Sequence, residues 1–457
     1  MPLNKKKEVY AMAFHHDYWQ KRLDELRRAT HVPGASLAVL MDGKIHEVAS
    51  GLLHRGTGVA ATTDSVFQLG SISKVYTATL VMQLVDAGRL ALDASIKDVL
   101  PEFPVSGSEK STIRQLLSHT SGLTSDFVVD TGRGDDCLAR YIEISKELRL
   151  DSPPGAITSY SSFAYNVLGR IIEVLMGQMW DNALREQLLT SLGLEHAVTL
   201  PEEVLRFRAA MGHLGEESQD PDPAPSWNLL PRSYGPSGSA LCATAADLVY
   251  FAQMHLDDGR AQDGTHILTA EAVAAMRHFE SEAPDKWTSG NVGWGLGWML
   301  YDWDGISVFG HDGATIGQKA YLRVVPEAGM AIALLTNGGS SDELYSLLYR
   351  ELFEKLAGVS MPNVAFGPSP HPPTVNIAPF VGTYMRQGNI MTITERKGTL
   401  HLAYEGAASF EMDLLPVSET VFAWAGAGQD WIPVVFTQLP DGSAYCYMGM
   451  RATPKVV

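Results

Sequence analysis

The stretch FQLGSISKVYTATLVMQLVDAG, residues 67–88, decides the fold of this chain. Its apolar run is long enough for a helix and ends at a glycine, which predicts one buried helix over residues 71–87. Ser71 and Lys74 stand three positions apart where this helix begins, so both side chains lie on one face. A lysine in a low-dielectric, cation-rich site can become the base that a serine nucleophile needs. An N-capping serine followed by a solvated lysine is the alternative, because so short a motif also arises by chance.

Strand patterns lie on both sides of this helix in the sequence. Residues 35–41 and 44–52 are β-rich runs joined by Asp42-Gly43, a dipeptide that favours a tight type I′ hairpin. Strand patterns return over residues 294–336, and the region between alternates helical stretches with loops rich in Pro and Gly. The simplest arrangement is an α/β fold, with one antiparallel sheet built from both ends and a helical subdomain inserted in the middle.

The chain divides unevenly into domains. Residues 1–360 are predicted to form one large domain, which closes with a helical pattern at 343–358. Five prolines make residues 361–377 a stiff linker. Residues 378–457 show short alternating strands with Gly-containing turns and no helical period, so we expect a small antiparallel β-barrel or sandwich.

Composition excludes several classes of partner and cofactor. With 35 basic and 52 acidic residues the net charge is −17, which argues against nucleic acid or an anionic membrane. No apolar run approaches the ~18 residues of a membrane span, and the apolar stretch after Lys5–Lys7 is too short for a secretory signal, so a cytoplasmic location is expected. Three widely spaced cysteines fit neither a disulfide framework nor a zinc site. Neither the histidine spacing nor the glycines predict a metal or nucleotide cofactor.

Five stretches carry a family resemblance. They are residues 67–103, 112–123, 154–173, 235–252 and 309–317. In order and coarse spacing they closely resemble the class C β-lactamase-like serine hydrolases, a family that also contains low-molecular-weight penicillin-binding proteins, D-aminopeptidases and esterases. The resemblance covers about residues 15–358 and implies a β-lactamase-like antiparallel sheet flanked by helices. The end domain resembles the lipocalin-like barrels attached to some of these hydrolases.

The resemblance implies a second motif, Tyr-x-Asn, whose tyrosine matches Tyr160. A phenol has a pKa near ~10, but beside Lys74 and another cation its ionised form is favoured, so it can move protons between serine, substrate and water. A core tyrosine in an aromatic-rich loop is the alternative. The third position is Ser162, not Asn, and its hydroxyl lacks the NH₂ donors that would hold a substrate carbonyl.

A third motif is His311-Asp312-Gly313, where β-lactamases have Lys-Thr-Gly. A histidine is charged only near or below pH ~6.5, so its help for a substrate carboxylate and for Tyr160 is expected to be weaker and pH-dependent. Gly313 lets a substrate backbone lie flat on the strand. By family analogy the backbone N–H of Ala314 completes an oxyanion hole with that of Ser71. A buried, satisfied histidine is the alternative for His311.

Other side chains give weaker signals. Arg451 near the chain end is a candidate clamp for a substrate carboxylate, with a surface arginine on a last strand as the commoner case. His119 is expected to be a hydrogen-bonding loop residue. Trp294 and Trp298, four apart in a strand-like run, are expected on one face, lining the cleft or the core.

These motifs predict an active-site serine hydrolase or acyltransferase. Ser71 attacks an amide, ester or thioester, Lys74 and Tyr160 move the proton, and water or an amine resolves the acyl-serine. The expected partner is a small-molecule or peptide substrate, with D-residues or a carrier-protein tether as options, and the oligomeric state is open. The alternatives are a penicillin-binding-protein-type thioesterase that releases and cyclises a nonribosomal peptide, a carboxylesterase with weak or no β-lactamase activity, and a catalytically retired peptide-binding protein.

Overall fold

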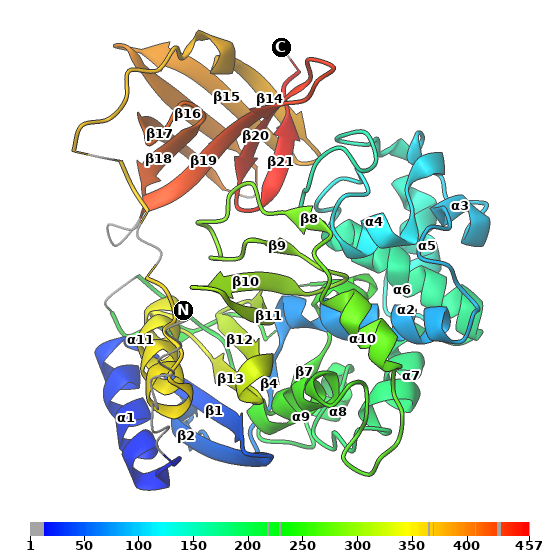
Figure 1. Cartoon of the computed structure of the whole chain (residues 1–457), viewed down its shortest axis with the longest axis vertical. Coiled ribbons are helices and arrows are strands. Elements are labelled where there is room, and N and C mark those ends of the chain that lie inside the picture. Colours follow the sequence, from blue (N-terminus) through cyan, green and yellow to red (C-terminus); the bar gives the residue numbers. More distant parts are fainter. Residues whose placement is uncertain are drawn as a thin grey trace, which may run out of the picture.

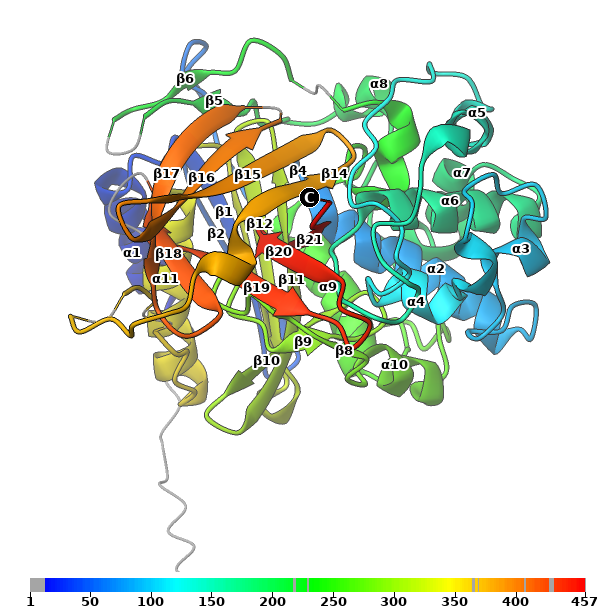
Figure 2. The same ribbon diagram turned by 90° about the horizontal axis from the view of Figure 1, so that it is seen from above.

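The computed structural model describes residues 13–216, 219–227, 230–363, 366–368, 370–406, 408–426 and 431–456. A mixed α/β body carries the first part of the chain, and a barrel of antiparallel strands carries the end (Figures 1 and 2). No helix among the described residues has the length and apolar character that crossing a membrane requires.

One antiparallel sheet of nine strands forms the centre of the large body, in the order β3-β2-β1-β13-β12-β11-β10-β9-β8. Strand β1 near the start of the chain pairs with β13, with Ala38 opposite Ala333, so the predicted sheet built from both ends is confirmed. The predicted hairpin after β1 is also present, because Asp42 and Gly43 have φ of 52° and 70° as a type I′ turn requires. The strands are β1 (Gly34–Met41), β2 (Lys44–His54), β3 (Val59–Ala60), β8 (Ser281–Glu282), β9 (Gly293–Trp294), β10 (Met299–Trp303), β11 (Ile306–Thr315), β12 (Gln318–Val325) and β13 (Met330–Thr336). Two short ladders lie outside this sheet, formed by β4 (Phe67–Gln68) with β7 (Cys242–Ala243) and by β5 (His213–Leu214) with β6 (Asp222–Pro223).

Helices cover both faces of the sheet (Figure 1). Helices α1 (His16–Ala29) and α11 (Ser341–Leu352) pack on one face, together with Leu37 and Val39 of β1. Alternate residues of β1, Ala38 and Leu40, join the larger core on the other face, as the two-residue period of a strand requires. The other helices are α2 (Ser73–Asp86), α3 (Ile96–Val99), α4 (Ile113–Leu117), α5 (Cys137–Ile144), α6 (Ser162–Met176), α7 (Trp180–Leu184), α8 (Pro201–Val204), α9 (Ala245–Leu256) and α10 (Ala270–Met276).

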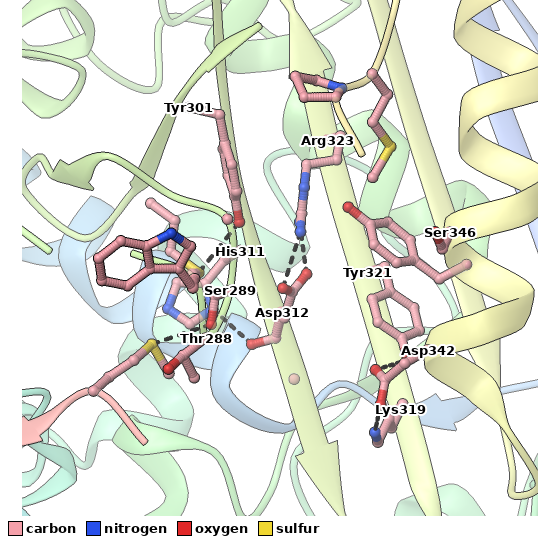
Figure 3. A pocket seen from close by; sticks show the side chains of 18 of the residues that line it. Thr288, Ser289, Tyr301, His311, Asp312, Lys319, Tyr321, Arg323, Asp342 and Ser346 are labelled. Atoms are coloured by element: carbon pink, nitrogen blue, oxygen red, sulfur yellow. Dashed lines mark hydrogen bonds and ion pairs between the residues drawn. The ribbon is translucent and has the colours of Figure 1, made fainter. Parts of the chain in front are cut away.

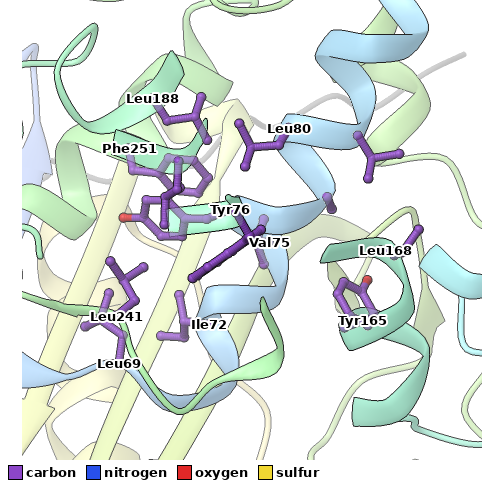
Figure 4. Packing of buried hydrophobic residues seen from close by; sticks show 14 of the residues in the cluster. Leu69, Ile72, Val75, Tyr76, Leu80, Tyr165, Leu168, Leu188, Leu241 and Phe251 are labelled. Carbon is purple, nitrogen blue, oxygen red and sulfur yellow. The ribbon is translucent and has the colours of Figure 1, made fainter. Parts of the chain in front are cut away.

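Helix α2 lies at the centre of the larger core (Figure 4). A 3-10 turn over Gly70–Ile72 leads into it, and all its residues except Gln83, Val85 and Asp86 are buried. Val75 and Tyr76 pack against residues of α6 and α9, such as Tyr165 and Phe251. A helix that is apolar all round belongs in the interior, so the prediction for residues 71–87 is confirmed.

The last eight strands pair with their neighbours in sequence and form a nearly closed barrel. A bridge between Tyr384 and Lys455 and a hydrogen bond from the Val456 N–H to the Thr383 carbonyl (2.8 Å) join its first and last strands. The barrel strands are β14 (Gly382–Arg386), β15 (Asn389–Arg396), β16 (Thr399–Glu405), β17 (Ser409–Pro416), β18 (Val421–Ala425), β19 (Trp431–Gln438), β20 (Ala444–Met448) and β21 (Arg451–Pro454). The predicted fold class is thereby confirmed, while the predicted boundaries at 360 and 377 stay a prediction.

The turn between β20 and β21 binds the barrel to the large body. The Tyr160 N–H donates to the Met450 carbonyl (2.9 Å), and the Met450 N–H donates to the Asp285 carboxylate (2.5 Å). Beside this turn, Ile157 packs against Val421 and Tyr447 of the barrel. The turn between β20 and β21 therefore lies against the segment that carries Tyr160.

The expectation that Trp294 and Trp298 share one face is wrong, whereas the expected core packing is confirmed for both. Gly295 and Trp298 close a tight turn, with an N–H to O distance of 2.9 Å and a φ of 94° at Gly297 between them. Trp294 therefore joins the smaller core and Trp298 the larger one, on opposite faces of the sheet.

Candidate active site

Ser71 and Lys74 meet at the beginning of α2, as the spacing predicts. The Lys74 ammonium lies 3.3 Å from the Ser71 hydroxyl and donates to the Ser237 carbonyl at 2.6 Å. The lysine side chain is wholly buried, whereas Ser71 lines a cavity. The geometry is that of a nucleophile beside a base.

Burial determines the charge of Lys74. It lowers the pKa of the ammonium to about 7, with Asp126 opposing the shift and Arg451 adding to it. The ammonium also lies 4.7 Å from the centroid of the Tyr160 ring. At neutral pH a large fraction of Lys74 is therefore the free amine that can accept a proton.

Tyr160 lies beside both residues, but the expectation that its ionised form is favoured is wrong. Burial raises the pKa of this phenol, and the hydrogen bond with Ser71 and the charge of Arg451 only partly oppose the rise. The second cation expected beside Tyr160 is present, since the Arg451 guanidinium lies 5.3 Å from the ring centroid. Desolvation outweighs it, so Tyr160 is a neutral proton donor in the free enzyme.

Two glycines allow the backbone to close around Ser71. A Cβ on Gly313 would lie 1.9 Å from the Leu69 carbonyl oxygen and 3.1 Å from the Ser71 nitrogen. A Cβ on Gly70 would lie 2.5 Å from the Ala314 nitrogen. The segment that carries Gly313 and Ala314 in β11 therefore lies against the turn that carries Ser71, as an oxyanion hole formed by these two N–H groups requires.

His311 lines the cavity but is not the pH-dependent cation that we expected. Burial lowers its pKa to about 3, with the nearby Lys74 adding to the shift. Its Nδ1 lies 2.7 Å from the Asp312 carbonyl oxygen, which can only accept, so Nδ1 carries the proton. Within the described part of the chain the buried Nε2 has no hydrogen-bond partner, and it carries a lone pair instead of a charge.

Arg451 reaches the cavity from the barrel, and its side chain is already paired. Its Nε donates to Asp126 at 2.7 Å, and its Nη1 donates to the Gly449 carbonyl at 3.0 Å. The guanidinium is thus held by Asp126 and is not the surface side chain of the commoner case. Its role in binding a substrate carboxylate stays a prediction.

Ser162 is not among the residues that line this cavity. It begins α6, and its N–H donates to the Ser125 carbonyl (2.8 Å). The structure therefore brings Ser71, Tyr160, His311, Gly313, Ala314 and Arg451 to one cavity, with Lys74 directly behind Ser71, and leaves Ser162 outside.

The cavity has a volume of about 720 Å³ and extends from Ser71 along β10 to β12 toward α11. Figure 3 shows Tyr301 and Tyr321 on either side of an ion pair that we did not predict. Arg323 donates to both carboxylate oxygens of Asp312, at 2.6 and 2.9 Å. The sequence contains a signal for this pair. Arg323 lies within the apolar strand KAYLRVV, and a buried arginine needs an anionic partner.

Two further neighbours of Tyr160 were missed. The His119 ring lies 4.6 Å and the Trp294 ring 5.4 Å from the Tyr160 ring, measured between centroids. His119 also binds the backbone on both sides of Tyr160, accepting from the Ser159 N–H at its carbonyl (2.8 Å) and from the Ser161 N–H at Nδ1 (3.1 Å). The expectation of a hydrogen-bonding loop residue is confirmed for His119. Its place beside Tyr160 follows from tertiary packing alone.

The chain is similar to known proteins in sequence and in fold. The β-lactamase family model matches residues 19–356. The chain is 58% identical over 380 residues to penicillin-binding protein 4 of Amycolatopsis lactamdurans, covering 82% of this chain and 99% of that protein. It is 31% identical over 355 residues to the esterase EstB of Burkholderia gladioli, covering 69% and 88% of the two chains.

A solved structure matches both parts of the chain. SurE, whose crystal structure has also been determined with D-Leu, is 30% identical with a TM-score of 0.82, covering 96% of this chain and 99% of SurE. The match extends over the sheet, the helices and the terminal barrel. The chain therefore belongs to the β-lactamase family of serine hydrolases, which act on amide and ester bonds.

Proposed function

We propose that this protein transfers the acyl group of a small peptide-like amide, ester or thioester through an acyl-serine on Ser71. The observation that carries the proposal is the buried Lys74 amine, 3.3 Å from the Ser71 hydroxyl and with its pKa lowered to about 7. A solvated lysine would be protonated at neutral pH and could not serve as this base. A protein that only binds peptides has no use for such a lysine.

The steps follow from the positions of the groups. Neutral Lys74 takes the proton of Ser71 as Oγ bonds to the substrate carbonyl carbon, and the oxyanion accepts from the N–H groups of Ser71 and Ala314. Tyr160 then donates its proton to the leaving group as the carbonyl–heteroatom bond breaks, and the Lys74 ammonium returns a proton to Tyr160. Water or an amine resolves the acyl-serine by the reverse sequence. Neutral His311 offers Nε2 as an acceptor for a substrate N–H.

The cavity favours a peptide over a compact β-lactam. Its volume of about 720 Å³ has room for several residues, and the barrel contributes Met450 and Arg451 to its lining. SurE, similar over almost the whole chain, has been crystallised with D-Leu. We therefore propose that the substrate is peptide-like and contains a D-residue. We also propose that the enzyme acts in the cytoplasm without a nucleic-acid or membrane partner.

A second candidate is aminolysis of a carrier-tethered thioester by the amine of the same peptide, which would release a cyclic product. The size of the cavity supports it, since a folded-back peptide needs space beside the acyl-serine. Hydrolysis and cyclisation share the acyl-enzyme, so only analysis of the products can distinguish the two reactions. Carboxylesterase activity, which the similarity to EstB supports, is the third outcome.

The experiment is active-site labelling followed by a substrate panel. Intact-mass spectra after a fluorophosphonate should show one adduct that is absent from Ser71→Ala. The panel then compares a p-nitrophenyl ester, D- and L-aminoacyl amides, a peptidyl thioester with a free amine, and nitrocefin. Absence of a Ser71-dependent adduct together with absence of turnover would contradict the proposal. A cyclic product from the thioester would select the second candidate.

A further inference from the structure

A second cavity, of about 640 Å³, lies between the barrel and the helical part of the large body. Residues 147–151 line one side of it, and the β14–β15 hairpin with the end of β21 lines the other. Neither Ser71 nor Tyr160 lines this cavity. It is distinct from the proposed acyl-transfer site.

A buried, incompletely paired cation lines this cavity. The Arg386 side chain is only 6% exposed, and its Nε and Nη1 make no hydrogen bond to any described residue. The nearest carboxylate oxygen, on Asp126, is 3.9 Å from Nη1 and already accepts from Arg451 at 2.7 Å. Buried charges in proteins are ordinarily paired and hydrogen-bonded, so one long ion pair to Asp126 leaves this arginine incompletely satisfied.

A carboxylate with one unsatisfied oxygen lines the same cavity. Among the described residues the buried Asp151 Oδ2 has no hydrogen-bond partner, and the carboxylate paired with Arg386 is that of Asp126. Each of the two side chains influences the charge of the other, so they are near but not in contact. An incompletely paired cation and an incompletely paired anion on one cavity are complementary to a ligand that carries both charges.

The geometry points to a binding site for a free α-amino acid in this cavity, with the ligand carboxylate on Arg386 and its ammonium on Asp151. A guanidinium binds a carboxylate through two parallel N–H groups, and a carboxylate is the natural acceptor for an ammonium. Leu150 and Ile390 supply apolar surface in the same lining for an aliphatic side chain. The site does not depend on the proposed function, because no group of the acyl-transfer mechanism takes part in it.

The test is calorimetric titration of the full chain with leucine, N-acetylleucine and leucine amide at pH 8. At that pH Asp151 is ionised, because burial raises the pKa of its carboxyl only to about 6. Leucine should bind saturably and at least about tenfold more tightly than either derivative, since each derivative loses one charged partner. Equal affinity of the three ligands, or no saturable heat with leucine, would overturn the assignment.

Matched variants locate the binding. Arg386→Gln and Asp151→Asn should each weaken leucine binding at least about tenfold, whereas Arg149→Gln, which removes an exposed charge from the same lining, should change it by less than about twofold. Ser71→Ala should retain full binding, which separates this cavity from the acyl-transfer site. An equal loss in Arg149→Gln, or a loss in Ser71→Ala, would contradict a site anchored by Arg386. Should Arg386→Gln fail to fold, Asp151→Asn and the ligand series still decide.

Discussion

Two walls of the cavity that contains Ser71 differ in how they are built. The serine wall, formed by Ser71, Lys74 and Tyr160, is held inside the large body, and Ser71 and Lys74 are three residues apart where α2 begins. The barrel wall, formed by Met450 and Arg451, reaches the cleft through contacts such as Arg451 to Asp126, which are 325 residues apart. The serine wall contains the groups that react, and Arg451 of the barrel wall lowers the pKa values of Lys74 and Tyr160. Changes in the first should therefore cost far more activity than changes in the second.

Lys74→Met should have the largest effect. It removes the base and leaves a side chain of similar length in the same buried space, so kcat/KM for a p-nitrophenyl ester should fall about 10³-fold or more. Thermal unfolding should change little, because an apolar side chain suits the buried position. Activity within tenfold of the wild type would mean that Lys74 is not the base.

Gly313→Ala should rank second. Its Cβ would lie 1.9 Å from the Leu69 carbonyl oxygen, so the segment carrying the Ala314 N–H must move away from Ser71. Loss of one oxyanion-hole donor typically costs about 10²- to 10³-fold in kcat. Gly305→Ala, in the turn before β11, has nothing within 4 Å of its new Cβ and serves as the control for activity, with some loss of stability from its φ of 89°.

Tyr160→Phe should lower kcat/KM about 10²-fold, because the leaving group loses its proton donor while the ring keeps its contacts with His119 and Trp294. The loss should be smaller for p-nitrophenyl esters than for amides, since p-nitrophenolate leaves without a proton. Equal losses on both substrates would contradict the role of donor.

The pH profile of the wild type tests the charge of Lys74. Because its pKa is lowered to about 7, kcat/KM should rise with pH up to about 7 and fall about tenfold per unit below it. His311 contributes no limb in this range, because its pKa is lowered to about 3. His311→Asn should therefore leave the position of the limb unchanged, even where it lowers the rate.

Arg451→Gln should have the smallest effect on rate, a loss of up to about tenfold. It leaves the partly buried Asp126 without its main partner, which should cost about 1–2 kcal/mol of unfolding free energy. The acid limb should also move to higher pH, because Arg451 helps to lower the pKa of Lys74. Asp126→Asn should move it to lower pH. Limbs that stay in place in both variants would show that the barrel wall does not influence the base.

Local geometry explains why much of the fold and part of the site could be predicted. The turn at Asp42-Gly43, the strand patterns and the buried helix depend on neighbours within a few residues, which the sequence displays directly. The turn between Trp294 and Trp298 was missed because the segment 294–298, WGLGW, alternates like a strand in sequence, although a Gly295 to Trp298 hydrogen bond closes it into a turn. The neutral states of Tyr160 and His311 were missed because desolvation depends on every element packed around them.

The sequence by itself determined that Ser71 and Lys74 share a helical face, that strands from both ends form one sheet, and that a barrel follows. A spacing of three residues places two side chains together whatever surrounds the helix. Only the tertiary structure decided that about half of Lys74 is the free amine at neutral pH, that Arg451 reaches Tyr160, and that Nε and Nη1 of Arg386 make no hydrogen bond to a described residue. Burial and long-range charge are sums over the whole packed molecule, and no short segment carries them.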